Sequence, residues 1–170
     1  MTALQGLLAD EEAITLMSMF LLASAKKDLS MCSFRLFGLQ KPKEEEVWST
    51  EVTKEDIENA VEDEFGVKYS KDWKRLLRAP TGLKGEYSII EGVKVIGDRA
   101  FWDCYSITNI NISNSVKSIG DYAFTGCIHL ASVNISNSVT KIGNYAFGYC
   151  INLPSHIKPD IIQRFGKKVF

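Results

Sequence analysis

Apolar and polar residues recur along the second half of the chain with a fixed spacing of 23 residues. Three segments align without a gap: VKVIGDRAFWDC (Val93 to Cys104), VKSIGDYAFTGC (Val116 to Cys127) and VTKIGNYAFGYC (Val139 to Cys150). A fixed period in the twenties is typical of stacked repeats, because one such unit cannot bury its apolar face without a neighbour. The pattern therefore predicts a protein that displays a surface built by stacking.

Short alternating stretches predict one strand in each repeat, since residues two apart on a strand point to the same face. The apolar residues of these stretches are expected to point inward: Ile107, Ile110, Ile112, Val133 and Ile135. Further repeated apolar positions complete the interior: Val116, Ile119, Ala123, Phe124, Val139, Ile142, Ala146 and Phe147. The polar residues between them form an outward row: Asn109, Asn111, Ser113, Ser132, Asn134 and Ser136. We predict that this row binds a partner; the alternative is that its members are merely solvated strand positions.

The first half of the chain does not repeat. Residues 8–27 predict a helix that is apolar nearly all round, and such a helix is expected to be buried. It either packs against its own domain or forms an interface, for a homodimer or for another partner. Alternating residues predict a short strand at Cys32, Phe34 and Leu36, and Lys41 to Glu46 is a charged linker.

A second helix is expected to begin at Thr53, which can act as its N-cap, and to stop at Gly66. Ile57, Val61 and Phe65 would lie on one face of it. Its other positions carry six carboxylates: Glu55, Asp56, Glu58, Glu62, Asp63 and Glu64. Such a face is usually only solvated, but Glu55, Glu58 and Glu62 are also a candidate docking face for a basic partner. The following stretch, Val67 to Leu77, predicts a hairpin that turns at Ser70-Lys71-Asp72.

Charge and composition exclude some classes of partner. A formal net charge of −1 and 45% hydrophobic residues are ordinary for a globular protein and predict no general affinity for nucleic acid or anionic membranes. The charge is uneven, because residues 1–85 carry 15 acidic and 12 basic side chains and residues 86–170 carry 6 and 8.

The compartment can be argued from the apolar residues 13–25, which resemble the core of a signal peptide followed by an Ala23-Ser24-Ala25 cleavage site. Acidic residues precede this stretch and Lys26 and Lys27 follow it, which suits a helix rather than an export signal. The stretch is also too short to cross a bilayer. We therefore expect a cytoplasmic protein without a membrane span, with an exported or cell-surface protein as the alternative.

The periodic cysteines Cys104, Cys127 and Cys150 are too far apart in sequence for the usual zinc motif. Equivalent positions of stacked repeats lie about 5 Å apart, so a disulfide between neighbouring coils is conceivable. Because a free cysteine packs as a small hydrophobe, we expect these three to be buried and reduced, as in a reducing compartment.

Candidate catalytic groups are few. The two histidines are His129 and His156, and His129 has no patterned acid or nucleophile near it. The sequence also has no phosphate-binding glycine loop, H-E-x-x-H or G-x-S-x-G motif. Gly97, Gly120 and Gly143 recur once per repeat, which a tight turn explains. We expect no catalytic residue, no cofactor and no metal.

The pattern I-x-x-x-V-x-x-I-G-x-x-A-F-x-x-C, followed by a hydrophobe three residues later, resembles the BspA-like leucine-rich repeats of bacterial proteins. Ile90, Ser113 and Ser136 stand where this family often has proline. The stretches GVKYSKDWKRLLRAP and IKPDIIQRFGKKVF resemble the flanks of short members. The resemblance implies an α+β fold with a short leucine-rich-repeat solenoid of about three 23-residue coils, capped by an N-terminal helix and hairpin region and a short C-terminal helix.

On this basis we divide the chain into four parts. Residues 1–52 are an N-terminal helix and strand region, residues 53–82 an acidic helix plus hairpin that forms the N-terminal cap, residues 83–153 the leucine-rich repeats, and residues 154–170 the C-terminal cap. In this last part, Asp160 is expected to start a brief helix whose Ile161, Ile162 and Phe165 cover the last coil.

The resemblance also implies a solenoid that binds proteins. We expect a non-catalytic protein-protein interaction module or scaffold of a bacterial cell, which recognises a protein partner through the repeat face, the N-terminal region or both. Exported relatives act as adhesins, so the alternative is an exported surface adhesin that binds host or cell-surface proteins. About three coils make a platform only about 15 Å long, so the N-terminal half is a serious candidate for setting the partner.

Overall fold

Short strands stack on one another at the repeat spacing in the computed structural model, which describes residues 48–170. The elements in chain order are α3 (Lys54–Glu58), β1 (Val61–Glu62), β2 (Lys68–Tyr69), β3 (Arg75–Arg78), β4 (Gly85–Ser88), β5 (Val95–Ile96), β6 (Ile107–Asn111), β7 (Ser118–Ile119), β8 (Ser132–Asn134), β9 (Lys141–Ile142), α4 (Lys158–Phe165) and the 3-10 helix η1 (Lys167–Val169). The predicted helix at residues 8–27, the strand around Phe34 and the linker up to Glu46 lie outside the described residues.

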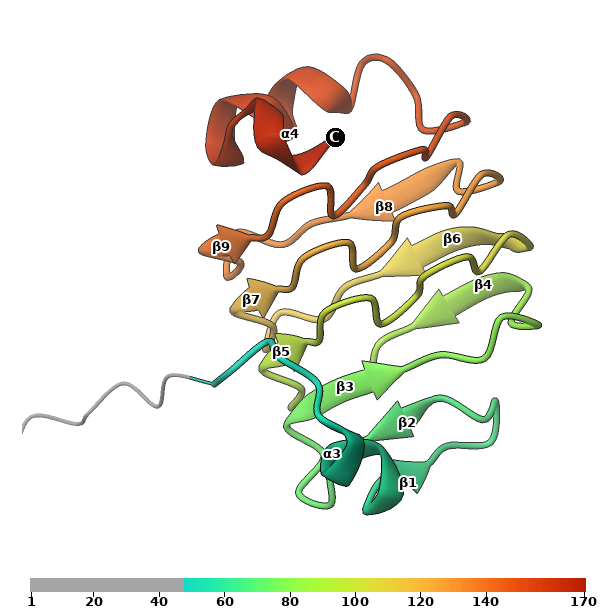
Figure 1. The fold of residues 1–170 in the computed structure, drawn as a ribbon. Coiled ribbons are helices and arrows are strands. Elements are labelled where there is room, and N and C mark those ends of the chain that lie inside the picture. The colour runs from blue at the N-terminus through green and yellow to red at the C-terminus, as the bar shows by residue number, and fades with distance from the viewer. Residues whose placement is uncertain (1–47) are drawn as a thin grey trace, which may run out of the picture. The chain divides into compact units, whose positions relative to one another are not determined.

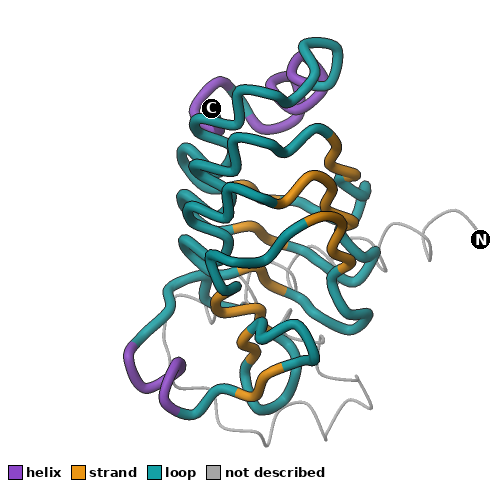
Figure 2. The backbone as a smooth tube through the Cα atoms, turned by 90° about the vertical axis from the view of Figure 1, so that its right-hand side faces the viewer, coloured by secondary structure: helices purple, strands orange, loops and turns teal. Residues whose placement is uncertain are grey.

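The strands form two sheets, ordered β1-β2-β3-β5-β7-β9 and β4-β6-β8 (Figure 1). Strands β3, β5, β7 and β9 pair in parallel, as do β4, β6 and β8, whereas the hairpin strands β1, β2 and β3 pair antiparallel. The chain therefore alternates between the two sheets as it passes from β4 to β9. Figure 2 shows the resulting coils stacked between a helix at each end.

The register of the strands explains the period of the sequence. Val95 pairs with Ser118 and Ser118 with Lys141 in the first sheet, and Asn109 pairs with Ser132 in the second. Each of these pairs joins residues 23 apart. The repeat length is therefore the length of chain needed for one turn around the interior.

The turn segments between the sheets also stack, and they carry phenylalanines into the interior. The backbone N–H of Phe101 donates to the carbonyl of Ala123 at 2.7 Å, and that of Phe124 donates to Ala146 at 2.7 Å. The ring centroids of Phe101 and Phe124 lie 5.1 Å apart, and those of Phe124 and Phe147 lie 5.2 Å apart. All three rings are buried, and burying a side chain of this size stabilises the fold by about 1.5–3 kcal/mol.

The inward positions predicted from the sequence are confirmed, except that Ile135 is only half-buried. The buried members are Ile107, Ile110, Ile112, Val116, Ile119, Ala123, Phe124, Val133, Val139, Ile142, Ala146 and Phe147. The repeat pattern thus identifies the core of this part of the chain.

The repeated glycines have a different reason from the predicted tight turn. Gly120 and Gly143 do not adopt positive φ angles. A Cβ atom on Gly120 would lie 2.6 Å from the backbone nitrogen of Asp98, and one on Gly143 would lie 2.5 Å from that of Asp121. Glycine is therefore required because the preceding coil approaches the backbone too closely for any side chain.

The predicted helix of residues 53–65 is wrong over its second half, because α3 ends at Glu58. Its beginning is confirmed. Thr53 and Asp56 form a capping box, in which each side chain accepts a hydrogen bond from the backbone N–H of the other residue.

The residues after α3 form a strand and a turn in place of the predicted helix. Val61 of β1 pairs with Tyr69 of β2, so this stretch joins the sheet. Between these strands, the side-chain oxygen Oδ1 of Asp63 accepts the N–H groups of Phe65 and Val67, both at 2.9 Å. Short polar side chains such as aspartate favour turns in this way, and here the turn replaces the last helical residues.

The predicted hairpin at residues 67–77 is confirmed, and its turn includes the three predicted residues. The N–H of Trp73 donates to the carbonyl of Ser70 at 2.8 Å, and Trp73 adopts a left-handed φ of 57°. Ser70 also accepts the N–H of Arg75 through its hydroxyl at 2.9 Å. The hairpin places β3 beside β5, where the parallel part of the sheet begins.

Residues 48–52, which we call the strap, belong to the same compact unit as the repeats. The carbonyl of Thr50 accepts the N–H of Asp98 at 2.8 Å, and Val52 lies where a side chain on Gly97 would point. In the following coils the Asp98 and Asp121 carboxylates accept the equivalent N–H groups. The strap therefore takes the place of a preceding coil for β5 (Figure 1).

The C-terminal helix begins at Lys158, slightly before the predicted Asp160. Its Ile161 is buried and its Ile162 and Phe165 are half-buried. The last residues also cover the interior, because the N–H of Phe147 donates to the carbonyl of Val169 at 2.8 Å.

Phe170 continues the aromatic stack, since its ring centroid lies 6.1 Å from that of Phe147. The end of the chain keeps the repeat register in a degenerate form that the sequence analysis missed. Five residues near the C-terminus stand 23 positions after the apolar and glycine residues of the last repeat: Ile162, Phe165, Gly166, Val169 and Phe170.

Candidate protein-binding face

The outer face of the β4-β6-β8 sheet carries four residues of the predicted row. Asn109 pairs with Ser132 and Asn111 with Asn134, so the four side chains form two short columns that cross β6 and β8. None of them is buried. Tyr87, Ile110 and Val133 alternate with these columns on the inner face. The structure therefore brings these four polar residues together on one surface.

Strand β4 extends both columns by one residue that the sequence analysis missed. Glu86 pairs with Asn109 and Ser88 with Asn111. The side-chain amide of Asn111 donates to the Glu86 carboxylate at 2.8 Å and to the Ser88 hydroxyl at 3.2 Å. Both residues could have been found by stepping 23 residues back from Asn109 and Asn111. We call the resulting six residues the polar face: Glu86, Ser88, Asn109, Asn111, Ser132 and Asn134.

Ser113 and Ser136, the other two residues of the predicted row, lie beyond the ends of β6 and β8. The Ser113 hydroxyl bonds that of Ser115 at 2.7 Å, and the Ser136 hydroxyl bonds that of Ser138 at 2.6 Å. These serines therefore hold the turns between the sheets and are not part of the polar face.

The three residues of the predicted acidic docking face do not share one helix. Glu55 and Glu58 are exposed on α3, whereas Glu62 is on β1 and lies 3.2 Å from the ammonium group of Lys68. The prediction that these three residues share one acidic helix face was wrong, because the helix is shorter than predicted. Glu55 and Glu58 remain an exposed acidic pair at this end of the domain.

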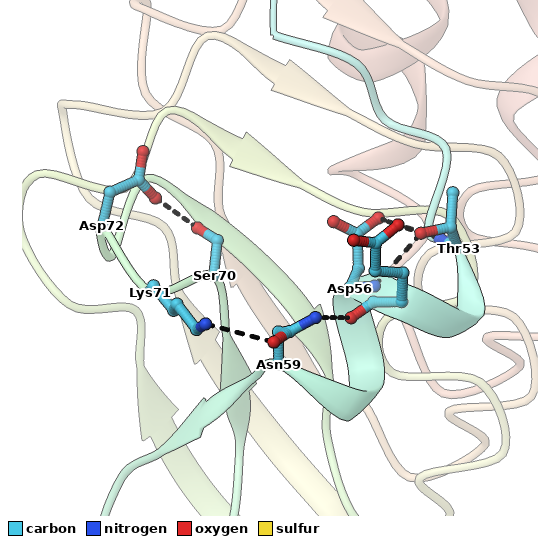
Figure 3. A pocket seen from close by; sticks show the side chains of 7 residues that line it. Thr53, Asp56, Asn59, Ser70, Lys71 and Asp72 are labelled. Carbon is cyan, nitrogen blue, oxygen red and sulfur yellow. Dashed lines mark hydrogen bonds between the residues drawn. The ribbon is translucent and has the colours of Figure 1, made fainter.

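A shallow depression of about 460 Å³ lies between α3 and the hairpin turn (Figure 3). Its polar groups hydrogen-bond one another: Ser70 donates to Asp72 at 2.6 Å, and Lys71 donates to Asn59 at 3.1 Å. Burial raises the pKa of the Asp72 carboxyl, but hydrogen bonds from Ser70 and Lys74 outweigh it, so this pKa lies below its ordinary value. Such an acid stays ionised and cannot serve as a proton donor near neutral pH.

Two buried tyrosines join the hairpin to the first repeat. The hydroxyls of Tyr69 and Tyr87 hydrogen-bond each other, and Tyr87 donates to Asp63 at 2.6 Å. Burial raises the pKa of Tyr69 to about 12. Burial and the hydrogen bond to the Asp63 carboxylate raise the pKa of Tyr87 still further above its ordinary value. These hydroxyls therefore stay protonated, and their hydrogen bonds hold the hairpin against the first repeat.

The periodic cysteines are free and buried, as predicted. The thiols of Cys127 and Cys150 donate to the carbonyls of Phe101 and Phe124, in each case at 3.2 Å. Burial raises the pKa of Cys104 to about 11 and that of Cys150 to about 12. A thiol with a raised pKa is a poor nucleophile and a poor metal ligand at neutral pH.

His129 and His156 are both exposed, and Nδ1 of His129 lies 2.6 Å from the carbonyl oxygen of Tyr105. Across residues 48–170, no three His, Cys, Asp or Glu side chains are grouped so that they could hold a metal ion. In the same part of the chain, no helix has the length and apolar character needed to span a membrane.

The pattern that defines the BspA type leucine-rich repeat region matches residues 85–170, half of the chain, in six copies. The chain belongs to this family. Repeats of the family are typically non-enzymatic, and they suggest binding to proteins. The number of coils, about three from the sequence, stays a prediction beside the six copies of the family pattern.

Solved structures of bacterial proteins share the fold. The crystal structure of the pneumococcal vaccine antigen PcpA is similar with a TM-score of 0.54 and 23% identity, over 56% of this chain and 24% of that chain. A leucine-rich repeat protein from Eubacterium ventriosum is similar with a TM-score of 0.53 and 30% identity, over 56% of this chain and 26% of that chain. The matching region thus spans about a quarter of each of these structures. No curated protein matches the chain.

Proposed function

We propose that this leucine-rich repeat protein is a non-catalytic module that recognises a protein partner through the polar face of the β4-β6-β8 sheet. The proposal rests on the alternation of buried and outer side chains along β6. Ile107 and Ile110 are fully buried in the core, while Asn109 and Asn111 are half-buried on the other face of the strand, where the chain covers Oδ1 of Asn109. The inner residues hold the coil in place, and the outer face leaves Asn111 and the exposed Asn134 available for contact.

The chemistry of the polar face suits selective recognition of a protein backbone or of polar side chains. Amide and hydroxyl groups both donate and accept hydrogen bonds, and five of the six side chains carry no charge. Their positions are fixed by the pairing of β6 with β4 on one side and with β8 on the other. A partner therefore meets a pre-formed pattern and loses little conformational freedom of this chain on binding.

The experiment compares two double variants in affinity purification from a lysate of the source cells. Asn111→Arg with Asn134→Arg adds bulk and charge to the polar face. Asn114→Arg with Asn137→Arg makes the same chemical change, at the same spacing, in exposed turns. We expect proteins bound by the wild type to be lost with the first variant and kept with the second. If every bound protein survives the first variant, the polar face is not the binding surface.

Two other surfaces compete with the polar face in that experiment. One is the exposed acidic pair Glu55 and Glu58, and the other is the predicted apolar helix at residues 8–27, which would also account for a homodimer. Loss of the bound proteins with Glu55→Gln and Glu58→Gln alone would assign the site to α3. Dimerisation that Met19→Glu abolishes in the full chain would assign an interface to the predicted helix.

A cytoplasmic location is part of this proposal, and the three free thiols favour it, because reducing compartments preserve thiols. The alternative is an exported adhesin, which is favoured by the apolar residues 13–25 and by the fold shared with a pneumococcal vaccine antigen. Mass spectrometry of the native N-terminus separates the two. A mature chain that starts at Lys26 would contradict the cytoplasmic location.

A further inference from the structure

Strand β4 is an edge of the three-stranded sheet, since among the described residues only β6 pairs with it (Figure 1). The N–H groups of Gly85 and Ile89 donate to carbonyls in or next to β6, at 3.0 and 2.9 Å. In a parallel ladder the backbone groups of successive residues point alternately to the two sides of the strand. The backbone groups of Glu86 and Ser88 therefore face away from β6, toward the open edge.

The other three edge strands of residues 48–170 are shorter than β4. Strands β1 and β9 have two residues each and β8 has three, whereas β4 has four. Just beyond β8, Arg164 of α4 also donates to the carbonyls of Ile135 and Ser136, at 3.3 and 3.1 Å. Natural sheets limit unwanted pairing with short edge strands or with a helix that covers the edge. Strand β4 is protected in neither way, which indicates that its edge is kept open for binding.

The side chains at this edge define which added strand would fit it. On the outer face, the Glu86 carboxylate accepts the Asn111 amide at 2.8 Å but forms no ion pair with a cation of residues 48–170. Lysine or arginine would therefore be the best neighbour for Glu86 on the added strand. On the inner face, the Phe65 ring lies 5.7 Å from that of Tyr87 and is 54% exposed. An apolar side chain of the added strand would cover part of this ring.

We propose that the open edge of β4 binds an extended segment of the protein partner, which lies beside β4 as an added strand. Its backbone bonds the free groups of Glu86 and Ser88, a basic residue lies beside the Glu86 carboxylate, and an apolar residue follows on the inner face. Strand addition takes its affinity from backbone hydrogen bonds and its specificity from alternate side chains. The inference rests on the proposed function, because the added strand would extend the polar face, and it specifies the conformation and charge of the bound segment.

The test measures amide hydrogen exchange of the full chain by NMR, with and without the synthetic peptide acetyl-Thr-Val-Lys-Val-Thr-Val-amide. In the free protein, we expect the N–H groups of Glu86 and Ser88 to exchange fast, because nothing bonds them. With about 1 mM peptide, their exchange should slow by about threefold or more. The N–H groups of Gly85 and Ile89 already bond within the sheet and should be protected in both samples.

Two substitutions of Ser88 separate backbone recognition from side-chain recognition. Proline removes the outward N–H group, which an edge strand tolerates, whereas alanine removes only the hydroxyl. We expect Ser88→Pro to weaken peptide binding by about tenfold and Ser88→Ala to leave it within about twofold of the wild type. Glu86→Lys should weaken binding of the lysine peptide and tighten binding of the same peptide with glutamate in place of lysine. Circular dichroism checks that each variant is folded, and the reversed preference of Glu86→Lys does not depend on any loss of structure.

Several results would overturn this inference. Protection of the Glu86 and Ser88 N–H groups in the free protein would show that the edge is already occupied, by a second copy if protection grows with protein concentration and by the chain itself if it does not. Unchanged exchange with the peptide, or equal losses for Ser88→Pro and Ser88→Ala, would exclude strand addition. If strand addition fails while Asn111→Arg with Asn134→Arg still abolishes partner binding, the proposed function stands and the partner is bound by side chains alone.

Discussion

The repeats and the two ends of the domain reach stability by different means. In the repeats, every coil meets a copy of itself, so Phe124 stacks on an equivalent ring on both sides. At each end of the stack there is no further coil, and a few single residues cover the interior in its place. The strap supplies a carbonyl and a valine at one end, and Val169 and Phe170 cover the other. The displayed faces therefore depend on a repeated core, whereas each end is closed by single residues that do not repeat.

The largest expected effect comes from cutting the aromatic stack in the middle of the repeats. Phe124→Ala removes a fully buried ring and leaves a cavity between two others, so we expect a loss of about 3–5 kcal/mol in the free energy of unfolding. Phe170→Ala removes a half-buried ring at the end of the same stack and should cost less than half as much. Urea unfolding of both variants measures the difference. Equal losses would show that the end is as tightly built as the centre.

Alkaline pH should weaken both regions, because the buried thiols and tyrosines must lose their protons to become charged. The pKa of Cys104 is raised from 9.0 to about 11, so its contribution is complete below pH 9 and is lost as pH rises through 11. For Tyr69 in the hairpin the corresponding window runs from pH 10 to about 12. A shift of this size corresponds to roughly 3 kcal/mol for each group.

Denaturant unfolding at pH 7 to 11 measures this effect. Cys104→Ala should flatten the fall that begins near pH 9, whereas Tyr69→Phe should leave that part of the curve unchanged. A free energy of unfolding that stays constant up to pH 11 would contradict the burial of these groups.

A smaller effect is expected where the coils approach each other most closely. Gly120→Ala would bring its Cβ to 2.6 Å from the backbone of the preceding coil, which the fold can relieve only by shifting the coils. We expect a loss of about 1–3 kcal/mol in stability. Gly82→Ala is the matched control, since nothing lies within 4 Å of the added atom. If both variants unfold at the same urea concentration, close approach is not the reason for this glycine.

The smallest effect concerns the start of α3. Thr53→Ala removes one half of the capping box and should lower stability by about 1 kcal/mol. Thr81→Ala changes an exposed turn residue in the same way and should alter it by less than about 0.5 kcal/mol. Thermal unfolding distinguishes the two. A loss for Thr53→Ala as large as that for Gly120→Ala would show that the ends are not held by weak single contacts.

The sequence predicted the repeats well because their pattern has a physical cause that recurs. Burial of Ile110 and Phe124 follows from alternation and spacing, without knowledge of any long-range contact. Prediction failed where a single local contact decided the structure. Asn59 caps α3 early, because its side-chain amide donates to the carbonyl of Glu55 at 3.0 Å, and Asp63 then turns the chain.

The candidate site shows the same contrast. Four members of the polar face were predicted from alternation in β6 and β8. Glu86 and Ser88 were missed because the first repeat lacks the full motif. Strand ends cannot be located from alternation alone, so the positions of Ser113 and Ser136 beyond the strands were missed, and their role in binding stays a prediction.

Site-specific photocrosslinking in the source cell tests whether the polar face recognises a protein. A photoreactive phenylalanine analogue would replace Asn134 on β8 or, as a control, Asn137 in the exposed turn that follows it. We expect a discrete crosslinked protein from position 134 and none from position 137. Crosslinks from position 137 alone, or from neither position while the partner still co-purifies, would show that the polar face is not the binding surface.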